Sequence, residues 1–192
     1  MKNTEVERKY AAPDPDGLRD QLKSLGAELI GTSRQTDRYF NHPSRDFLAD
    51  DVVSEWLRLR HDDPGTGDPA DVTHSFNFKQ WLPLGDPNAS HADEFETVIG
   101  DPDPITEALH RLGFADMVTV DKARERWQLA DVEICVDAVE DLGSFVEFEY
   151  IGSGHLDDAH EKIADLIDAV GEQLLGARDR RGYPYLLLGR EA

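Results

Sequence analysis

Apolar residues recur at helical spacing in three stretches of the chain. The first follows the helix-start signal Asp14-Pro15-Asp16, and the second is short and ends at Gly113. The third follows Asp157. The spacing of three or four residues predicts three amphipathic helices with polar outer faces. Their apolar positions are Leu18, Leu22, Leu25 and Leu29, then Ile105, Leu109 and Leu112, and then Ala159, Ile163, Leu166, Ile167, Val170 and Leu174.

Between the helices, polar and apolar residues alternate with the period of two that is typical of strands. Pro, Gly and Asp clusters separate the segments, and those at 62–72 and 83–92 resemble hairpin loops. With about seven or eight strands and two or three helices, the pattern predicts an α+β fold built on an antiparallel β-barrel or strongly curved sheet. A length of 192 residues suits one domain over 1–192. The segments are 4–10, 55–61, 73–81, 94–100, 118–128, 131–138 and 144–151.

Charged residues follow one face of most of these strands. The strands at 131–138 and 144–151 have strongly apolar opposite faces, which we expect to pack beneath helices, so that the charged faces point into the barrel. Buried charges are costly unless they are paired, bound to metal or neutralised by ligand. The acids on these faces are Glu5, Glu7, Glu94, Glu96, Asp137, Glu147 and Glu149, and the bases are Lys9, Arg58, Arg60, Lys79, Lys122 and Arg124, with Arg126 a further candidate.

These charges have two interpretations. They can be cross-strand ion pairs on a solvated sheet face, a common arrangement. However, the chain has only six lysines, and Lys9, Lys79 and Lys122 all fall on the charged faces. Carboxylates suit Mg²⁺ or Mn²⁺, and Arg and Lys neutralise phosphate oxygens, so we favour a metal–polyphosphate site.

The acidic composition narrows the function further. Forty Asp and Glu residues against 20 Lys and Arg give a formal charge of −20, which disfavours binding to nucleic acid or anionic membranes. Such a surface also suits a halophilic source, because molar salt screens its self-repulsion. The single cysteine, Cys135, excludes a disulfide framework. With no expected membrane span or signal peptide, we expect a cytoplasmic protein.

The ordered motifs along the chain resemble the CYTH superfamily, the triphosphate tunnel metalloenzymes. The stretch at 35–47 resembles the class IV adenylyl cyclase branch in particular, and together with the composition it suggests a halophilic archaeon as the source. The motifs are Glu5-x-Glu7-x-Lys9, QTDRYFNHPSRDF at 35–47, WLRLR at 56–60, FNFKQ at 76–80, EFE at 94–96, VDKARERW at 120–127 and VDAVEDLGSFVEFE at 136–149.

The resemblance implies an eight-stranded antiparallel tunnel that holds a triphosphate and one or two Mg²⁺ or Mn²⁺ ions. A basic residue that we expect just before the EFE stretch is replaced by His91 or missing. The implied metal ligands are Glu5, Glu7, Glu96, Asp137, Glu147 and Glu149, with Glu94 the weaker choice beside Glu96. The implied phosphate-binding residues are Lys9, Arg58, Arg60, Lys79, Lys122 and Arg124, of which Lys9, Arg58 and Lys122 are assigned the catalytic role.

Three functions are compatible with this site. The resemblance favours an adenylyl cyclase that converts ATP into cyclic AMP and pyrophosphate. The alternatives are a triphosphatase acting on inorganic, thiamine or nucleoside triphosphate, and a non-catalytic nucleotide or polyphosphate sensor. A homodimer is possible. The sequence leaves open whether Trp56 and Trp81 pack in the core or stack on a purine, and whether Asp37 pairs with Arg45.

Overall fold

The computed structural model describes residues 2–49 and 53–189, which fall into two compact units. Unit 1 contains residues 2–4, 34–49, 53–121 and 181–189, and unit 2 contains residues 5–33 and 122–180. Each unit is therefore assembled from segments that lie far apart in the sequence. The single domain over 1–192 stays a prediction.

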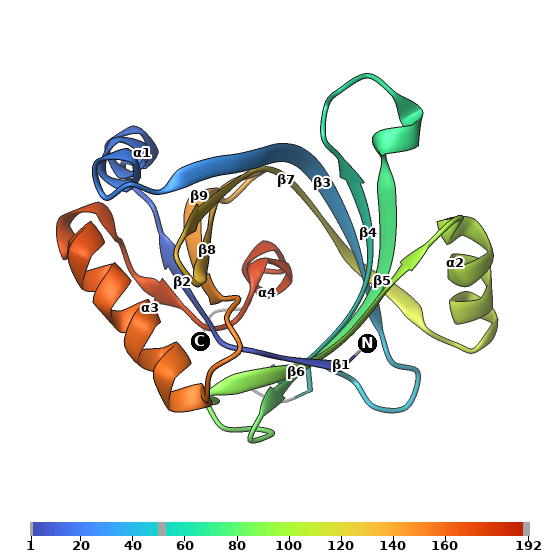
Figure 1. Cartoon of the computed structure of the whole chain (residues 1–192). Helices are drawn as coiled ribbons and strands as arrows, with labels where there is room; N and C mark the ends of the chain where they lie inside the picture. The colour runs from blue at the N-terminus through green and yellow to red at the C-terminus, as the bar shows by residue number, and fades with distance from the viewer. Residues whose placement is uncertain (1, 50–52, 190–192) are drawn as a thin grey trace. The chain divides into compact units, whose positions relative to one another are not determined.

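The described residues form ten strands, not the eight expected (Figure 1). Strand neighbours in unit 1 run β1-β6-β5-β4-β3-β7, and those in unit 2 run β3-β7-β8-β9-β2-β10, because β3 and β7 contribute residues to both units. The seven predicted segments correspond to β2, β4, β5, β6, β7, β8 and β9. The strands are β1 (Lys2–Glu5), β2 (Glu7–Ala11), β3 (Glu28–Asn41), β4 (Glu55–Asp63), β5 (Thr73–Leu82), β6 (His91–Ile99), β7 (Ala115–Leu129), β8 (Val132–Val139), β9 (Gly143–Tyr150) and β10 (Arg178–Asp179).

The strand β3 was not predicted, and Leu29, which we expected on the first helix, lies in it and is exposed. Both faces of this strand are polar over much of its length, so the hydropathy alternation that marks the other strands is lost. One face carries the buried Gln35 and Asp37, and the other carries Arg34 and Arg38. A strand of this kind is stable because its inward polar groups find partners on β4.

The core of unit 1 lies on one face of its strands. Phe40 of β3 and Leu57 and Leu59 of β4 pack there with Leu109 of α2 (Pro102–Arg111) and with Phe47. The strands pair antiparallel, β3 with β4, β4 with β5 and β5 with β6. This pairing places the apolar side chains of neighbouring strands on the same face. Because successive side chains point to opposite faces, Arg58 and Arg60 are directed away from this core.

The core of unit 2 is built in the same way. Ile134 and Val136 of β8 and Val146 and Phe148 of β9 are almost fully buried. They pack beneath α1 (Pro15–Ser24) and α3 (Leu156–Val170), which contact each other (Figure 1). The prediction that helices cover these apolar faces is confirmed. It follows that the charged residues between them, on the other face of β8 and β9, are directed away from the helices.

Local signals set the helix ends. The Asp14 carboxylate accepts a hydrogen bond from the Gly17 amide at 3.0 Å, and the Asp101 carboxylate accepts one from Asp103 at 3.0 Å. The helix α3 begins at Leu156, one residue before the expected start signal, and ends at Val170, so Leu174 lies in the short η2 (Glu172–Leu174). The remaining helical turns are η1 (Pro69–Asp71) and α4 (Tyr183–Leu187).

Over the described ranges, the structure holds no helix with the length and apolar character that a membrane crossing requires.

Candidate functional site

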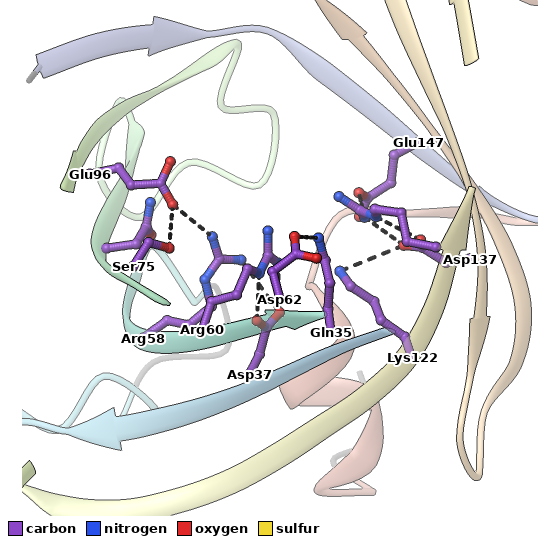
Figure 2. A network of polar contacts seen from close by, with 12 residues as sticks. Gln35, Asp37, Arg58, Arg60, Asp62, Ser75, Glu96, Lys122, Asp137 and Glu147 are labelled. Atoms are coloured by element: carbon purple, nitrogen blue, oxygen red, sulfur yellow. Dashed lines mark hydrogen bonds and ion pairs between the residues drawn. The ribbon is translucent and has the colours of Figure 1, made fainter. Parts of the chain in front are cut away.

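A buried carboxylate organises the charged face of unit 1. Asp37 of β3 is 0% exposed and lies opposite Arg60 of β4 in the ladder. Arg60 donates two parallel hydrogen bonds to it, from Nε to Oδ1 at 2.6 Å and from Nη2 to Oδ2 at 2.7 Å (Figure 2). Arg58 Nη1 lies 3.6 Å from the same Oδ2. Asp37 therefore holds two adjacent guanidinium groups of one strand in fixed positions.

Polar side chains of β5 connect this arginine pair to the carboxylates of β6. Arg58 Nη2 lies 3.9 Å from Glu96 Oε1, which also accepts a hydrogen bond from the Ser75 hydroxyl at 2.9 Å (Figure 2). The buried Asn77 donates from Nδ2 to Glu94 Oε1 at 2.6 Å. Charged and neutral polar side chains of β3, β4, β5 and β6 thus interact along the face opposite the core.

Aromatic residues flank the network in unit 1. Trp56 is buried and packs edge-to-face against Tyr39, with 5.6 Å between ring centroids, so its packing role is confirmed. The Lys79 ammonium lies 4.7 Å from the centroid of the Trp81 ring, a cation–π contact. Trp81 is only partly buried, and its ring contacts a predicted phosphate-binding lysine.

Unit 2 carries a second charged network on β2, β7, β8 and β9. Lys9 Nζ lies 3.0 Å from Glu147 Oε1, directly across the β2/β9 ladder. Arg124 donates two hydrogen bonds to Asp137, from Nε at 2.7 Å and from Nη2 at 2.6 Å, and a third to Glu147. Lys122 Nζ lies 3.7 Å from Asp137 Oδ2 (Figure 2). Three basic residues therefore share two carboxylates.

Mutual attraction keeps these groups charged despite their burial. Burial alone raises the pKa of Glu147, but Lys9, Arg124 and Lys122 outweigh it and hold the pKa well below the ordinary value. Burial raises the pKa of Asp137 as well, and Arg124 and Lys122 lower it on balance. For Lys9, burial lowers the pKa, whereas Glu147, Glu7 and Asp179 together raise it above its usual value. The shifts of Lys9, Asp137 and Glu147 thus all favour the charged forms.

The guanidinium groups behave in the same way. Burial lowers the pKa of Arg58, but the surrounding Asp37, Tyr39, Glu94 and Glu96 raise it on balance. Burial likewise lowers the pKa of Arg124, while Asp137 and Glu147 raise it well above the ordinary value. Both arginines therefore remain permanent cations, as phosphate binding requires.

Residues 3–176 match the family model of the CYTH domain. This chain belongs to the CYTH family. It is 33% identical over 145 residues to a Methanocaldococcus jannaschii protein named "Putative adenylate cyclase", an alignment that covers 76% of this chain and 75% of the relative.

Solved CYTH-like structures share the fold. The PH1819 protein from Pyrococcus horikoshii superimposes with a TM-score of 0.79 at 30% identity, covering 97% of this chain and 99% of that one. A Hippeastrum protein, named a "putative adenylyl cyclase" with a dominant triphosphatase activity, superimposes with a TM-score of 0.66 at 16% identity. That alignment covers 100% of this chain and 98% of the plant protein, and it supports the fold alone.

CYTH proteins are metal-dependent, and the donors in unit 2 have the right chemistry for a hard divalent cation. Glu7 lies directly opposite Glu149 across β2 and β9, and Glu149 lies opposite Glu133 across β9 and β8. Like charges that face each other destabilise a ladder, so a cation between them is favourable. Glu5, at the end of β1, is buried.

The side chains as they stand do not converge on one ion. Within residues 2–49 and 53–189, no group of three or more His, Cys, Asp or Glu side chains is placed to hold a metal. Metal binding therefore requires carboxylates to rotate. For Asp137 and Glu147 it also requires exchange of their ion pairs with Arg124, Lys122 and Lys9. The metal-ligand assignments of Glu5, Glu7, Glu96, Asp137, Glu147 and Glu149 stay predictions.

The structure adds residues that sequence reasoning missed and corrects one pairing. Asp37 binds Arg60 and Arg58, whereas Arg45 lies 3.3 Å from Glu55, so the suggested Asp37–Arg45 pair is wrong. Ser75 and Glu133 were also missed. Their signal was positional, because each lies four residues before a recognised member of a charged face, Lys79 and Asp137, and therefore on the same face of its strand.

Proposed function

We propose that this protein is a metal-dependent phosphotransfer enzyme of the CYTH family that converts ATP into cyclic AMP and pyrophosphate. Membership of the family and the name of the M. jannaschii relative support this choice. The stretch at 35–47, which resembles class IV adenylyl cyclases, supports it further.

The observation that carries the proposal is the burial of lysine. Lys9 and Lys122 are 8% and 3% exposed, and both lie beside carboxylates on a strand face. Lysine is rarely buried, and in a chain with only six lysines its placement in two such positions indicates a ligand of opposite charge. A polyphosphate supplies that charge.

In the proposed reaction, the basic residues bind the phosphate oxygens and hold the chain of phosphates in one orientation. The residues that the family resemblance implies for this role are Lys9, Arg58, Arg60, Lys79, Lys122 and Arg124. The oxygen of the ribose 3′-hydroxyl attacks the α-phosphorus, the bond from that phosphorus to the bridging oxygen breaks, and the hydroxyl proton is lost to a base or to water. Fixed cations stabilise the charge that moves onto the leaving pyrophosphate.

An ion pair also holds one of these basic side chains in place before a ligand binds. Asp37, which is not among the candidate metal ligands, holds Arg60 in a bidentate contact. Side chains that are already immobilised lose little entropy when a ligand binds, and they need not reorganise in the transition state. Bound Mg²⁺ or Mn²⁺, held by the acidic candidates, would neutralise phosphate oxygens and polarise phosphorus.

A triphosphatase is the second candidate. The same cations serve a reaction in which water attacks the terminal phosphorus and orthophosphate leaves. The Hippeastrum protein, a "putative adenylyl cyclase" with a dominant triphosphatase activity, is an example of this fold with that activity. A nucleotide or polyphosphate sensor would bind the same ligands without turnover.

Identification of the reaction products distinguishes the cyclase, the triphosphatase and the sensor. Purified protein is incubated in molar KCl with Mg²⁺ or Mn²⁺ and with ATP, thiamine triphosphate or inorganic triphosphate, and the products are analysed by mass spectrometry. Cyclic AMP with pyrophosphate supports the cyclase, and orthophosphate supports the triphosphatase. Tight binding without product supports the sensor. Absence of both binding and turnover contradicts the proposal.

The composition supports an intracellular setting rich in salt, in keeping with the proposed halophilic archaeal source and cytoplasmic location. For the same reason we propose that the partners are triphosphates and metal ions, without nucleic acid or membrane. We also propose a homodimer, and light scattering of the purified protein measures its oligomeric state.

A further inference from the structure

Two histidines face each other on the other side of unit 1, away from the arginine pair. His61 of β4 lies opposite His74 of β5 in the antiparallel ladder. His61 follows Arg60 directly, so the two point to opposite faces of the strand. His61 Nδ1 lies 3.0 Å from His74 Nε2, and the ring centroids are 5.0 Å apart. The pair therefore belongs to a surface separate from the proposed phosphate-binding residues.

We propose that His61 and His74 form a binding site for a divalent transition-metal ion of the Cu²⁺, Ni²⁺ and Zn²⁺ class. Imidazole nitrogen is a preferred ligand of all three ions. The site is distinct from the carboxylate set expected to bind Mg²⁺ or Mn²⁺, because these hard cations prefer oxygen.

The separation of the two nitrogens fits such an ion. With metal–nitrogen bonds of about 2.0–2.1 Å, two ligands at a right angle lie about 2.9 Å apart, and two tetrahedral ligands lie about 3.3–3.4 Å apart. The observed 3.0 Å is close to the right-angle value, which is typical of Cu²⁺ and Ni²⁺. A metal at this angle lies off the line between the two nitrogens, so each ring turns out of the present hydrogen bond by about 45° when the ion binds.

The surroundings allow both access and rigidity. His61 is exposed and His74 is partly exposed, so water can complete the coordination sphere. The register places both histidines in one row with Thr36 of β3 and Ile99 of β6, within regular strands. Backbone pairing thus holds the two ligands in place before the ion arrives, which lowers the entropic cost of binding.

The test is a titration of chelator-treated, untagged full-length protein with CuCl₂, followed by calorimetry and electron paramagnetic resonance. We expect one high-affinity Cu²⁺ per chain, with a spectrum that shows two nitrogen ligands. His61→Gln and His74→Gln should each weaken binding at least tenfold and remove one nitrogen from the spectrum. His155→Gln, a change at an exposed histidine outside the pair, should leave both unchanged.

NiCl₂ and ZnCl₂ should compete with Cu²⁺ for the site, whereas 10 mM MgCl₂ should not. Because both histidines reach solvent, the Gln variants should fold, which circular dichroism checks independently of metal. Copper binding that is unchanged in either Gln variant, or no binding by the wild-type protein, would overturn the proposal.

Discussion

Lys9 and Glu147 face each other across β2 and β9, with 3.0 Å between Nζ and Oε1, and both side chains are largely buried. Glu147 also accepts a hydrogen bond from Arg124, so one carboxylate pairs with two cations of unit 2. Loss of its charge would therefore remove a partner from both.

Replacement of Glu147 by glutamine keeps the shape of the side chain and removes its charge. We expect a loss of about 3–5 kcal/mol in the free energy of unfolding, because Lys9 and Arg124 lose a buried partner. Urea denaturation in molar KCl measures it. Glu161→Gln, the same change at an exposed position of α3, should shift the free energy by less than about 0.5 kcal/mol. Equal effects of the two variants would show that the pair contributes little.

The stability of the protein should depend on pH at both extremes. Asp137 and Glu147 have pKa values below the ordinary ones, so they stabilise the fold above about pH 4, and this contribution is lost as the pH falls through their folded pKa. The pKa of Lys9 is raised, so its contribution is present below about pH 10 and is lost as the pH rises through the folded pKa.

We therefore expect thermal unfolding midpoints that are nearly constant between about pH 5 and 9 and that fall on either side. In Glu147→Gln, one of the two carboxylates no longer titrates, so the fall on the acid side should be shallower than in the wild type. An identical acid limb in both proteins would contradict the assignment.

The Arg60–Asp37 contact should depend on the guanidinium shape. Arg60→Lys keeps the charge but replaces two parallel hydrogen bonds with a single point contact, and we expect a loss of about 1–3 kcal/mol in unfolding free energy. Arg38→Lys is the matched control. Arg38 makes the same bidentate contact with Asp116, at 2.7 and 2.8 Å, but its side chain is 40% exposed. At this more solvated position less than about 1 kcal/mol is expected. Equal losses of unfolding free energy in the two variants would show that burial does not set the strength of the contact.

Salt should stabilise the protein, since a formal charge of −20 opposes compaction. Screening lengths shorten to about 3 Å at 1 M salt, which removes most repulsion between surface carboxylates. We expect the thermal midpoint to rise steeply from 0.1 to 2 M KCl and to rise equally with NaCl. A midpoint that is unchanged, or that falls with salt, would argue against a salt-adapted surface.

Much of the fold could be predicted from the alternation of polar and apolar residues along the strands. The apolar residues Ile134, Val136, Val146 and Phe148 predicted both the strands and the helices that cover them, because one face had to be buried. The strand β3 was missed because its inward face carries Gln35 and Asp37. Such burial is stable because Gln35 and Asp37 bind Asp62 and Arg60 on the neighbouring strand. The hydropathy pattern of one segment does not identify partners on another strand.

The charged faces were predictable, but the pairing within them was not. Sequence proximity suggested Asp37 with Arg45, whereas the ladder places Asp37 opposite Arg60. Register also decides that Glu7, Glu149 and Glu133 form one row, and this depends on strand order that a single sequence does not state.

The most direct test of the account is a calorimetric titration of the protein with inorganic triphosphate in molar KCl and Mg²⁺. We expect binding in which Lys122→Met and Arg58→Met each weaken affinity at least tenfold. Lys162→Met, a change at an exposed lysine of α3, should leave it unchanged. Triphosphate binding that is equally strong in all three variants, or absent from the wild-type protein, would contradict the claim that these charged faces bind a triphosphate.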